Sequence, residues 1–146
     1  MKTFKFTLNT VLKYKEQVLG YSKAEYAKAL QAVRECEKKI KDLESMYEQQ
    51  AKECENRKRN GIDILNLKIY ECHLESLDLQ IRREKQTLER LEQRAEEKRL
   101  VMVDMKKEAA SIGKIKERKY ILYNKEVLKQ EEQFIEEFVA NQRHTV

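Results

Sequence analysis

Apolar and aromatic side chains recur at every seventh residue through the first third of this chain. The series consists of Leu12, Leu19, Tyr26, Val33, Ile40, Tyr47 and Cys54. This spacing holds one narrow stripe of a helix against a partner helix, which is the pattern of a coiled coil. The companion positions, three residues further on, carry smaller or more polar side chains. We therefore expect a paired helix with one strong and one weak seam position.

The repeat stops at Asn60-Gly61 and then resumes. Asn-Gly is a turn signal, and glycine readily adopts the left-handed conformation that ends a helix. Asp63 is suited to cap the following helix through its carboxylate. The second series consists of Leu67, Leu74, Ile81, Leu88, Ala95, Met102 and Ala109. Two repeats separated by a single turn predict that the chain pairs with itself as an antiparallel hairpin.

A turn centred near Gly61 determines which residues of the two series face each other. Antiparallel pairing then places Val33 beside Leu91, an apolar layer. The same register places Ile40 opposite Glu84, which is a poor layer because a carboxylate is costly to bury. Most other layers are apolar on both sides, which supports the hairpin.

The composition allows these helices to be very long. The chain has no proline and only three glycines, and Ala, Glu, Lys, Arg and Leu make up just over half of its 146 residues. We predict an all-α fold, a single domain over residues 1–146, with helices at about 8–58 and 63–140 and a turn at about 59–62. At 1.5 Å per residue the helices are roughly 75 and 115 Å long, so the second overhangs the first by roughly 40 Å.

Beyond Gly113 the phase of the repeat changes, and a new apolar stripe begins at Ile121, Leu128 and Ile135. An amphipathic helix with nothing to pack against is marginally stable, so this stripe requires a partner. Phe4 and Phe6 are expected to fold back onto the overhang and to supply part of that partner. The rest is expected to come from another protein.

Catalytic and metal-binding signatures are absent from the sequence. No phosphate-binding loop of the G-x-x-x-x-G-K-[ST] type occurs, and a two-helix rod has no pocket for a catalytic histidine. Neighbouring helical residues point about 100° apart, so Cys72 and His73 are poorly placed to share a metal ion. We expect Cys36 and Cys54 to be small seam residues and His73 to lie on the surface. The predictions are no enzymatic activity, no cofactor and no metal.

Charge and cysteine content limit the classes of partner and the cellular location that the chain can have. The net charge of +5 is a small excess among 57 charged residues, and Arg57-Lys58-Arg59 could meet an acidic surface. Residues 114–129 interleave lysines with tyrosines, a pattern typical of nucleic-acid binding, but an acidic block follows that would repel phosphates. No membrane-spanning segment or secretory signal is predicted. Three cysteines in a helical pattern favour a reducing cytoplasm. A nucleic-acid-binding or a generic scaffold coiled coil remain the alternatives.

The chain resembles flagellar export proteins of the FliJ family. The resemblance rests on a break before mid-chain at Asn60-Gly61, on the closing stretch Glu132–Ile135, and on two groups of residues. The opening group is Phe4, Phe6, Leu8, Val11, Leu12, Lys13 and Glu16, and the second group is Tyr70, Leu74 and Leu77.

The resemblance implies a cytoplasmic component of the flagellar type III export apparatus, peripheral at the inner face of the cell membrane. Proteins of this family form an antiparallel coiled coil similar to the central stalk of rotary ATP synthases. They insert the terminal end into the hexameric export ATPase and promote its assembly and activity. They also contact the export gate, a membrane protein, and export chaperones. No nucleic-acid partner is implied.

Two sets of residues are candidates for these contacts. For the ATPase, the candidates are the two N-terminal phenylalanines, the unpartnered apolar stripe of the overhang and the basic residues near it. These are Phe4, Phe6, Lys116, Lys119, Ile121, Leu128 and Ile135. For the export gate, the resemblance points to the half nearer the turn, at Leu43, Tyr47, Tyr70, His73 and Leu77.

Overall fold

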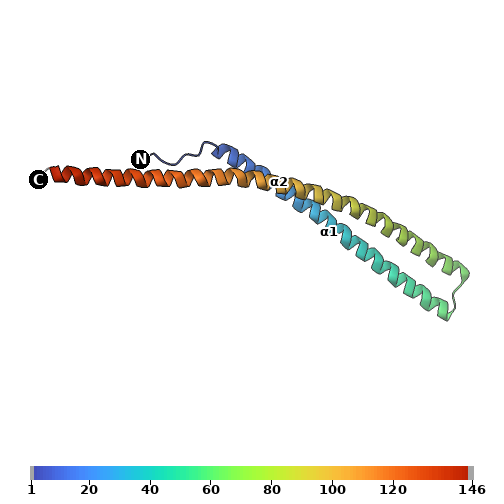
Figure 1. The fold of residues 1–146 in the computed structure, drawn as a ribbon. Coiled ribbons are helices and arrows are strands. Elements are labelled where there is room, and N and C mark those ends of the chain that lie inside the picture. The colour runs from blue at the N-terminus through green and yellow to red at the C-terminus, as the bar shows by residue number, and fades with distance from the viewer. Residues whose placement is uncertain (1, 145–146) are drawn as a thin grey trace. The chain divides into compact units, whose positions relative to one another are not determined.

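The computed structural model describes residues 2–144, which form two long helices joined by a short turn (Figure 1). Helix α1 (Asn9–Asn60) has 52 residues and helix α2 (Ile64–His144) has 81. Residues 2–144 contain no strand. The predicted fold class, two long helices packed as a hairpin, is confirmed. The helix ends lie one to four residues from the predicted ones. Neither described helix has a stretch long and apolar enough to cross a lipid bilayer.

The turn forms where the sequence predicts it. Gly61 has a φ of 93°, a left-handed conformation that costs little only for glycine, and it ends α1 directly after Asn60. The Asp63 carbonyl accepts a hydrogen bond from the Leu67 amide at 2.9 Å, so Asp63 stands at the N-cap of α2. The proposed role of its carboxylate stays a prediction.

The packing divides the chain into two compact units, each built from part of α1 and part of α2. The turn unit consists of residues 22–102 and contains the hairpin turn. The terminal unit brings together residues up to 21 and residues from 103 onward.

The core of the turn unit confirms the predicted register. Val33 and Ala29 of α1 form a buried cluster with Ala95 of α2, and Leu88 and Leu91 pack against it. Val33 and Leu91 therefore lie in the same layer, as the hairpin register requires.

The companion positions of the first series are more deeply buried than predicted. Ser22, Ala29 and Cys36 are buried, whereas the larger Tyr47 of the first series is exposed. Small side chains at these positions do not reach past the seam, so they are covered by the opposite helix, and a large aromatic side chain extends out of it. The seam of the turn unit is thus made largely of small and aliphatic residues.

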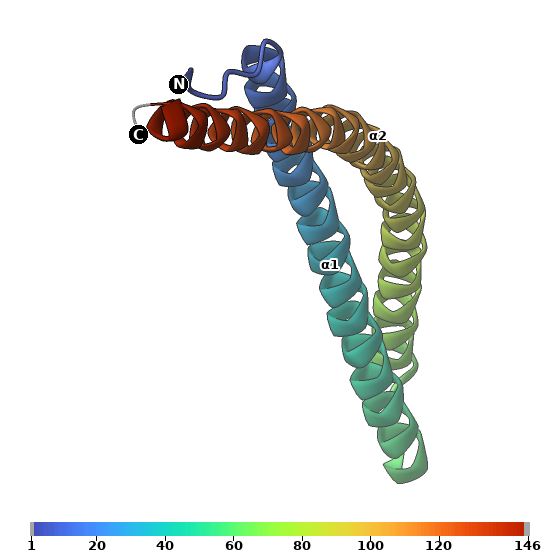
Figure 2. The same cartoon turned by 60° about the vertical axis from the view of Figure 1, so that its left-hand side comes forward.

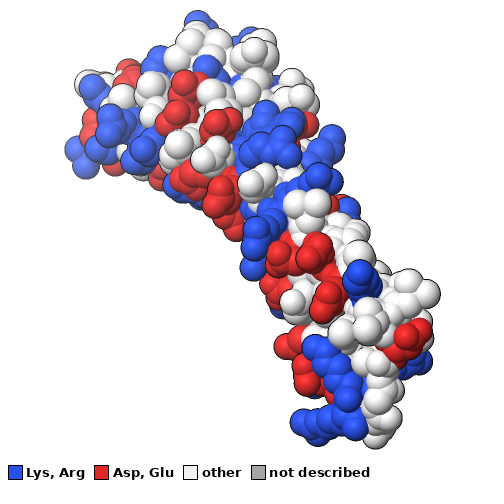
Figure 3. All heavy atoms as spheres, turned by 90° about the vertical axis from the view of Figure 1, so that its right-hand side faces the viewer, with Lys and Arg blue, Asp and Glu red and all other residues white. Residues whose placement is uncertain are grey.

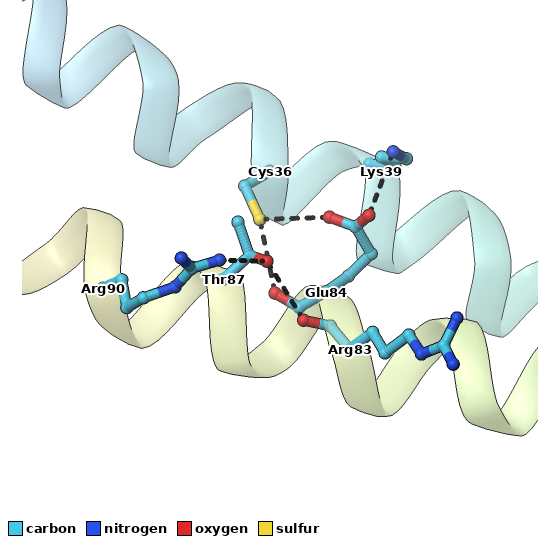
Figure 4. Close-up of polar contacts among 6 residues, drawn as sticks. All are labelled: Cys36, Lys39, Arg83, Glu84, Thr87 and Arg90. Atoms are coloured by element: carbon cyan, nitrogen blue, oxygen red, sulfur yellow. Dashed lines mark hydrogen bonds and ion pairs between the residues drawn. The ribbon is translucent and has the colours of Figure 1, made fainter.

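In the unfavourable layer at Ile40 and Glu84, the carboxylate extends across to α1 and is satisfied there, where it lies between Cys36 and Lys39 (Figure 4). Ile40 is buried, while Glu84 forms an ion pair with Lys39 at 3.0 Å. The Cys36 thiol donates to the Glu84 carbonyl at 3.5 Å and to its carboxylate Oε2 at 3.7 Å. Burial, followed by the nearby Glu84 carboxylate, raises the pKa of the Cys36 thiol, which keeps the thiol protonated as a donor.

Candidate partner-binding surfaces

In the terminal unit, the N-terminal segment, residues 2–8, packs against α2. The Phe4 ring meets Tyr120 edge-on, with ring centroids 5.2 Å apart, and lies 5.4 Å from the ring of Tyr123. The Tyr123 hydroxyl donates to the Lys2 carbonyl at 2.6 Å. Figures 1 and 2 both show this segment beside the C-terminal part of α2. Ring contacts and a backbone hydrogen bond therefore hold the segment in place.

A second group of contacts continues this attachment toward the start of α1. Phe6 is buried, and the Lys119 ammonium lies 5.8 Å from the centroid of its ring, a cation–π contact. Lys116 donates to the Asn9 side-chain oxygen at 3.3 Å. The structure therefore brings together four of the seven residues predicted to face the ATPase, which come from both ends of the chain: Phe4, Phe6, Lys116 and Lys119.

The remaining three residues, Ile121, Leu128 and Ile135, lie on a different side of α2. They are 49–59% exposed, and we call them the terminal stripe. Tyr123 follows Ile121 by two residues and so points about 200° away around the helix. The prediction that the N-terminal segment folds back onto this part of α2 is confirmed, but its phenylalanine contacts lie on the tyrosine side and not on the stripe. The same end of α2 also exposes Leu122, Phe134, Phe138 and Val139.

The five residues predicted to face the export gate do not form one continuous surface in the turn unit. Tyr47 and His73 are exposed, and Leu43 and Tyr70 are half-buried. Leu77 is only 2% exposed, so it has almost no surface to offer while the helices are paired.

Tyr70 is held at the edge of the seam by neighbours from α1. The Arg57 guanidinium lies 5.5 Å from the centroid of its ring. Burial, followed by a hydrogen bond with Glu53, raises the pKa of the Tyr70 hydroxyl. These contacts make Tyr70 a bridge between the two helices near the turn, which leaves only part of its side chain accessible.

Sequence reasoning missed a row of exposed residues on the turn unit. Leu65, Ile69, Cys72 and Leu79 of α2 are exposed, and we call them the outer stripe. Their spacing of four, three and seven residues places them on one helix face, on the side away from the seam residue Leu77. The signal was present in the sequence, since positions 65, 72 and 79 are themselves seven residues apart.

The remaining surface is mixed in charge, and residues 2–144 hold no metal-binding cluster. Lysines and arginines alternate with acidic residues on the face drawn in Figure 3. Cys36 and Cys54 are buried seam residues and His73 is exposed, as predicted. Among the described residues, no group of three or more His, Cys, Asp or Glu side chains could hold a metal ion.

Comparison with known proteins identifies one family. The chain matches the family model described as Flagellar FliJ protein over residues 4–145, nearly its whole length. The match includes most of the N-terminal segment, from Phe4 onward, and the terminal stripe. No curated protein and no solved structure matches the chain.

Proposed function

From the premise that the chain belongs to the FliJ family, and so is a component of flagellar type III protein export, we propose that it serves as a stalk for the hexameric export ATPase. In this role the terminal unit enters the ATPase ring and promotes its assembly and activity. The chain contributes a shaped helical surface, and catalysis takes place on the ATPase.

The observation that carries this proposal is the terminal stripe. Three aliphatic side chains at seven-residue spacing are about half exposed on a helix where the N-terminal segment packs on another side. Covering such a stripe would contribute roughly 25 cal/mol for each Å² of apolar area removed from water. The lumen of a protein ring can surround a single helix and cover it on all sides, whereas a flat protein surface would cover only one.

The charges around the stripe suit a protein socket better than a nucleic acid. Lys125 and Lys129 precede a run of acidic residues that includes Glu131 and Glu132. A phosphate backbone would be repelled by the acidic run, while a protein surface can present both signs.

The test replaces the stripe and leaves unchanged the residues whose ring contacts and hydrogen bonds hold the N-terminal segment. A variant carrying Ile121→Ser, Leu128→Ser and Ile135→Ser should stay folded, because these side chains are already exposed. It should lose most of its stimulation of the cognate export ATPase in a phosphate-release assay. A matched control is Leu100→Ser with Val101→Ser, which changes exposed aliphatic residues in the turn unit. Full stimulation by the stripe variant would refute the proposed contact.

We also propose that the outer stripe of the turn unit contacts the export gate, together with Tyr47 and His73. The support is exposure: the outer stripe is accessible, whereas Leu77 can act only by keeping the helices paired. Leu65→Glu with Ile69→Glu should abolish capture by the cytoplasmic domain of the gate protein. Ile64→Glu is a suitable control, because Ile64 is exposed but lies about 100° from Leu65 around the helix. Equal capture of both variants would place the gate contact elsewhere.

Two further parts of the proposal follow from these contacts. Binding to the gate would hold a cytoplasmic chain at the inner face of the cell membrane, and export chaperones would be handled at the same location. Cell fractionation tests this location: the chain should sediment with membranes in cells that have the gate protein and remain in the supernatant in cells that lack it. Membrane association in both would contradict it.

A further inference from the structure

An open groove lies in the terminal unit between the N-terminal segment and α2. Its volume is about 950 Å³. It is lined by Lys2, Thr3, Phe4, Lys5, Lys119, Leu122, Tyr123 and Glu126. Both walls are formed by the chain itself, because the Tyr123 hydroxyl bonds the Lys2 carbonyl and Phe4 packs on Tyr120. The groove therefore exists before any partner binds.

The lining combines an apolar surface with an excess of positive charge. Phe4, Leu122 and Tyr123 supply carbon surface, and the ammonium groups belong to Lys2, Lys5 and Lys119. Glu126 is the only acidic side chain among the lining residues. A ligand that fits this lining carries several negative charges and at least one apolar side chain.

We propose that this groove binds an acidic peptide segment whose carboxylates pair with the three lysines and whose apolar side chain packs on Leu122, beside Phe4. The inference rests on the proposed function in one respect: the segment would belong to the export ATPase subunits that receive the terminal unit. It adds the chemistry of that contact and a site distinct from the terminal stripe.

A nucleic acid fits the same groove less well. Binding of single strands depends on aromatic faces that are free to stack with bases. Here Phe4 is packed against Tyr120 and Tyr123, whose own rings lie 6.5 Å apart, so the rings are engaged with one another.

The direct test measures binding of a fluorescein-labelled peptide of six glutamates around one leucine to the full chain by fluorescence anisotropy. Replacing Lys2, Lys5 and Lys119 by glutamine should weaken binding about tenfold, since each exposed ion pair contributes only a small factor. The matched control replaces three lysines outside the groove, Lys114, Lys125 and Lys129, and should change affinity less than twofold. Raising the salt concentration should weaken binding to the unaltered chain.

Three results would overturn the inference: no binding of the peptide by the unaltered chain, equal losses in the groove and control variants, or tighter binding of a single-stranded oligonucleotide of equal charge. ATPase stimulation separates this inference from the proposed function. If the groove variant loses the peptide but stimulates fully, the groove is not an ATPase contact and the stalk function stands. If the terminal-stripe variant stimulates fully while the groove still binds the peptide, the proposed stalk contact fails and the peptide site remains.

Discussion

Replacing Leu77 by alanine should destabilise the turn unit far more than the same replacement at Leu79. The two leucines are two residues apart on α2, but Leu77 is 2% exposed and Leu79 is 48% exposed. The pair therefore separates burial in the seam from every effect of helix propensity, because both substitutions exchange the same side chains in the same helix.

The burial of each leucine sets the expected loss in the free energy of unfolding. Leu77→Ala removes three buried carbon atoms, which at about 0.8 kcal/mol each amounts to roughly 2.4 kcal/mol, and the cavity left behind brings the cost to about 3 kcal/mol. Leu79→Ala removes carbon atoms that are already half in water, and alanine is the better helix former, so its cost is expected to be below about 1 kcal/mol. For a chain of this length, 1 kcal/mol corresponds to roughly 2–4 °C in melting temperature.

Thermal unfolding followed by circular dichroism at 222 nm should show a fall of about 6–12 °C for Leu77→Ala and a much smaller change for Leu79→Ala. Amide hydrogen exchange should place the loss of protection in the turn unit, which contains Leu77. Equal shifts for the two variants would refute the rotation of α2 on which the burial of Leu77 depends, and with it the assignment of the outer stripe.

Gly61→Ala should lower the free energy of unfolding by about 1 kcal/mol or more, because φ is 93° at this position. Gly20→Ala, inside α1 with open space at its Cβ position, should raise it by about 0.5–1 kcal/mol. Urea unfolding measures both changes, and shifts of the same sign would contradict the turn geometry. The pKa of the Cys36 thiol is raised in the folded chain, so this group's contribution to stability is fully present below the unfolded thiol pKa of about 8.5. The contribution is lost as the pH rises through the folded pKa. Cys36→Ala should therefore flatten the fall in melting temperature above about pH 8.5, and an unchanged slope would exclude this thiol as its source. Spin labels can be placed at the exposed positions Gln31 and Gln93 after the exposed Cys72 has been replaced. Electron paramagnetic resonance should then report a short distance between the labels, and a separation of several helix diameters would rule out the register.

The sequence alone was sufficient for the helices, the turn and the register. A seven-residue repeat interrupted once by Asn60-Gly61 is compatible with little other than a hairpin, and the turn position then dictates that Val33 meets Leu91. Both follow from local rules, namely the 3.6-residue period of the helix and the freedom of glycine at positive φ. The N-terminal phenylalanines also lie against α2 near Lys116 and Lys119, as expected for apolar side chains that had no other partner. That these residues face the ATPase stays a prediction.

The accessible faces depended on tertiary packing. The repeat shows which residues share a stripe, but the depth to which each one sinks depends on the rotation of both helices and on the side chain opposite. Leu77 lies in the seam, where the repeat places it, and its burial leaves little surface for the gate contact that the resemblance implies, which stays a prediction. The outer stripe was overlooked because its repeat is weaker than that of the seam. The N-terminal segment likewise packs on the side of Tyr120 and Tyr123 because aromatic rings there can pack edge to face, a preference that a pattern of apolar positions does not contain.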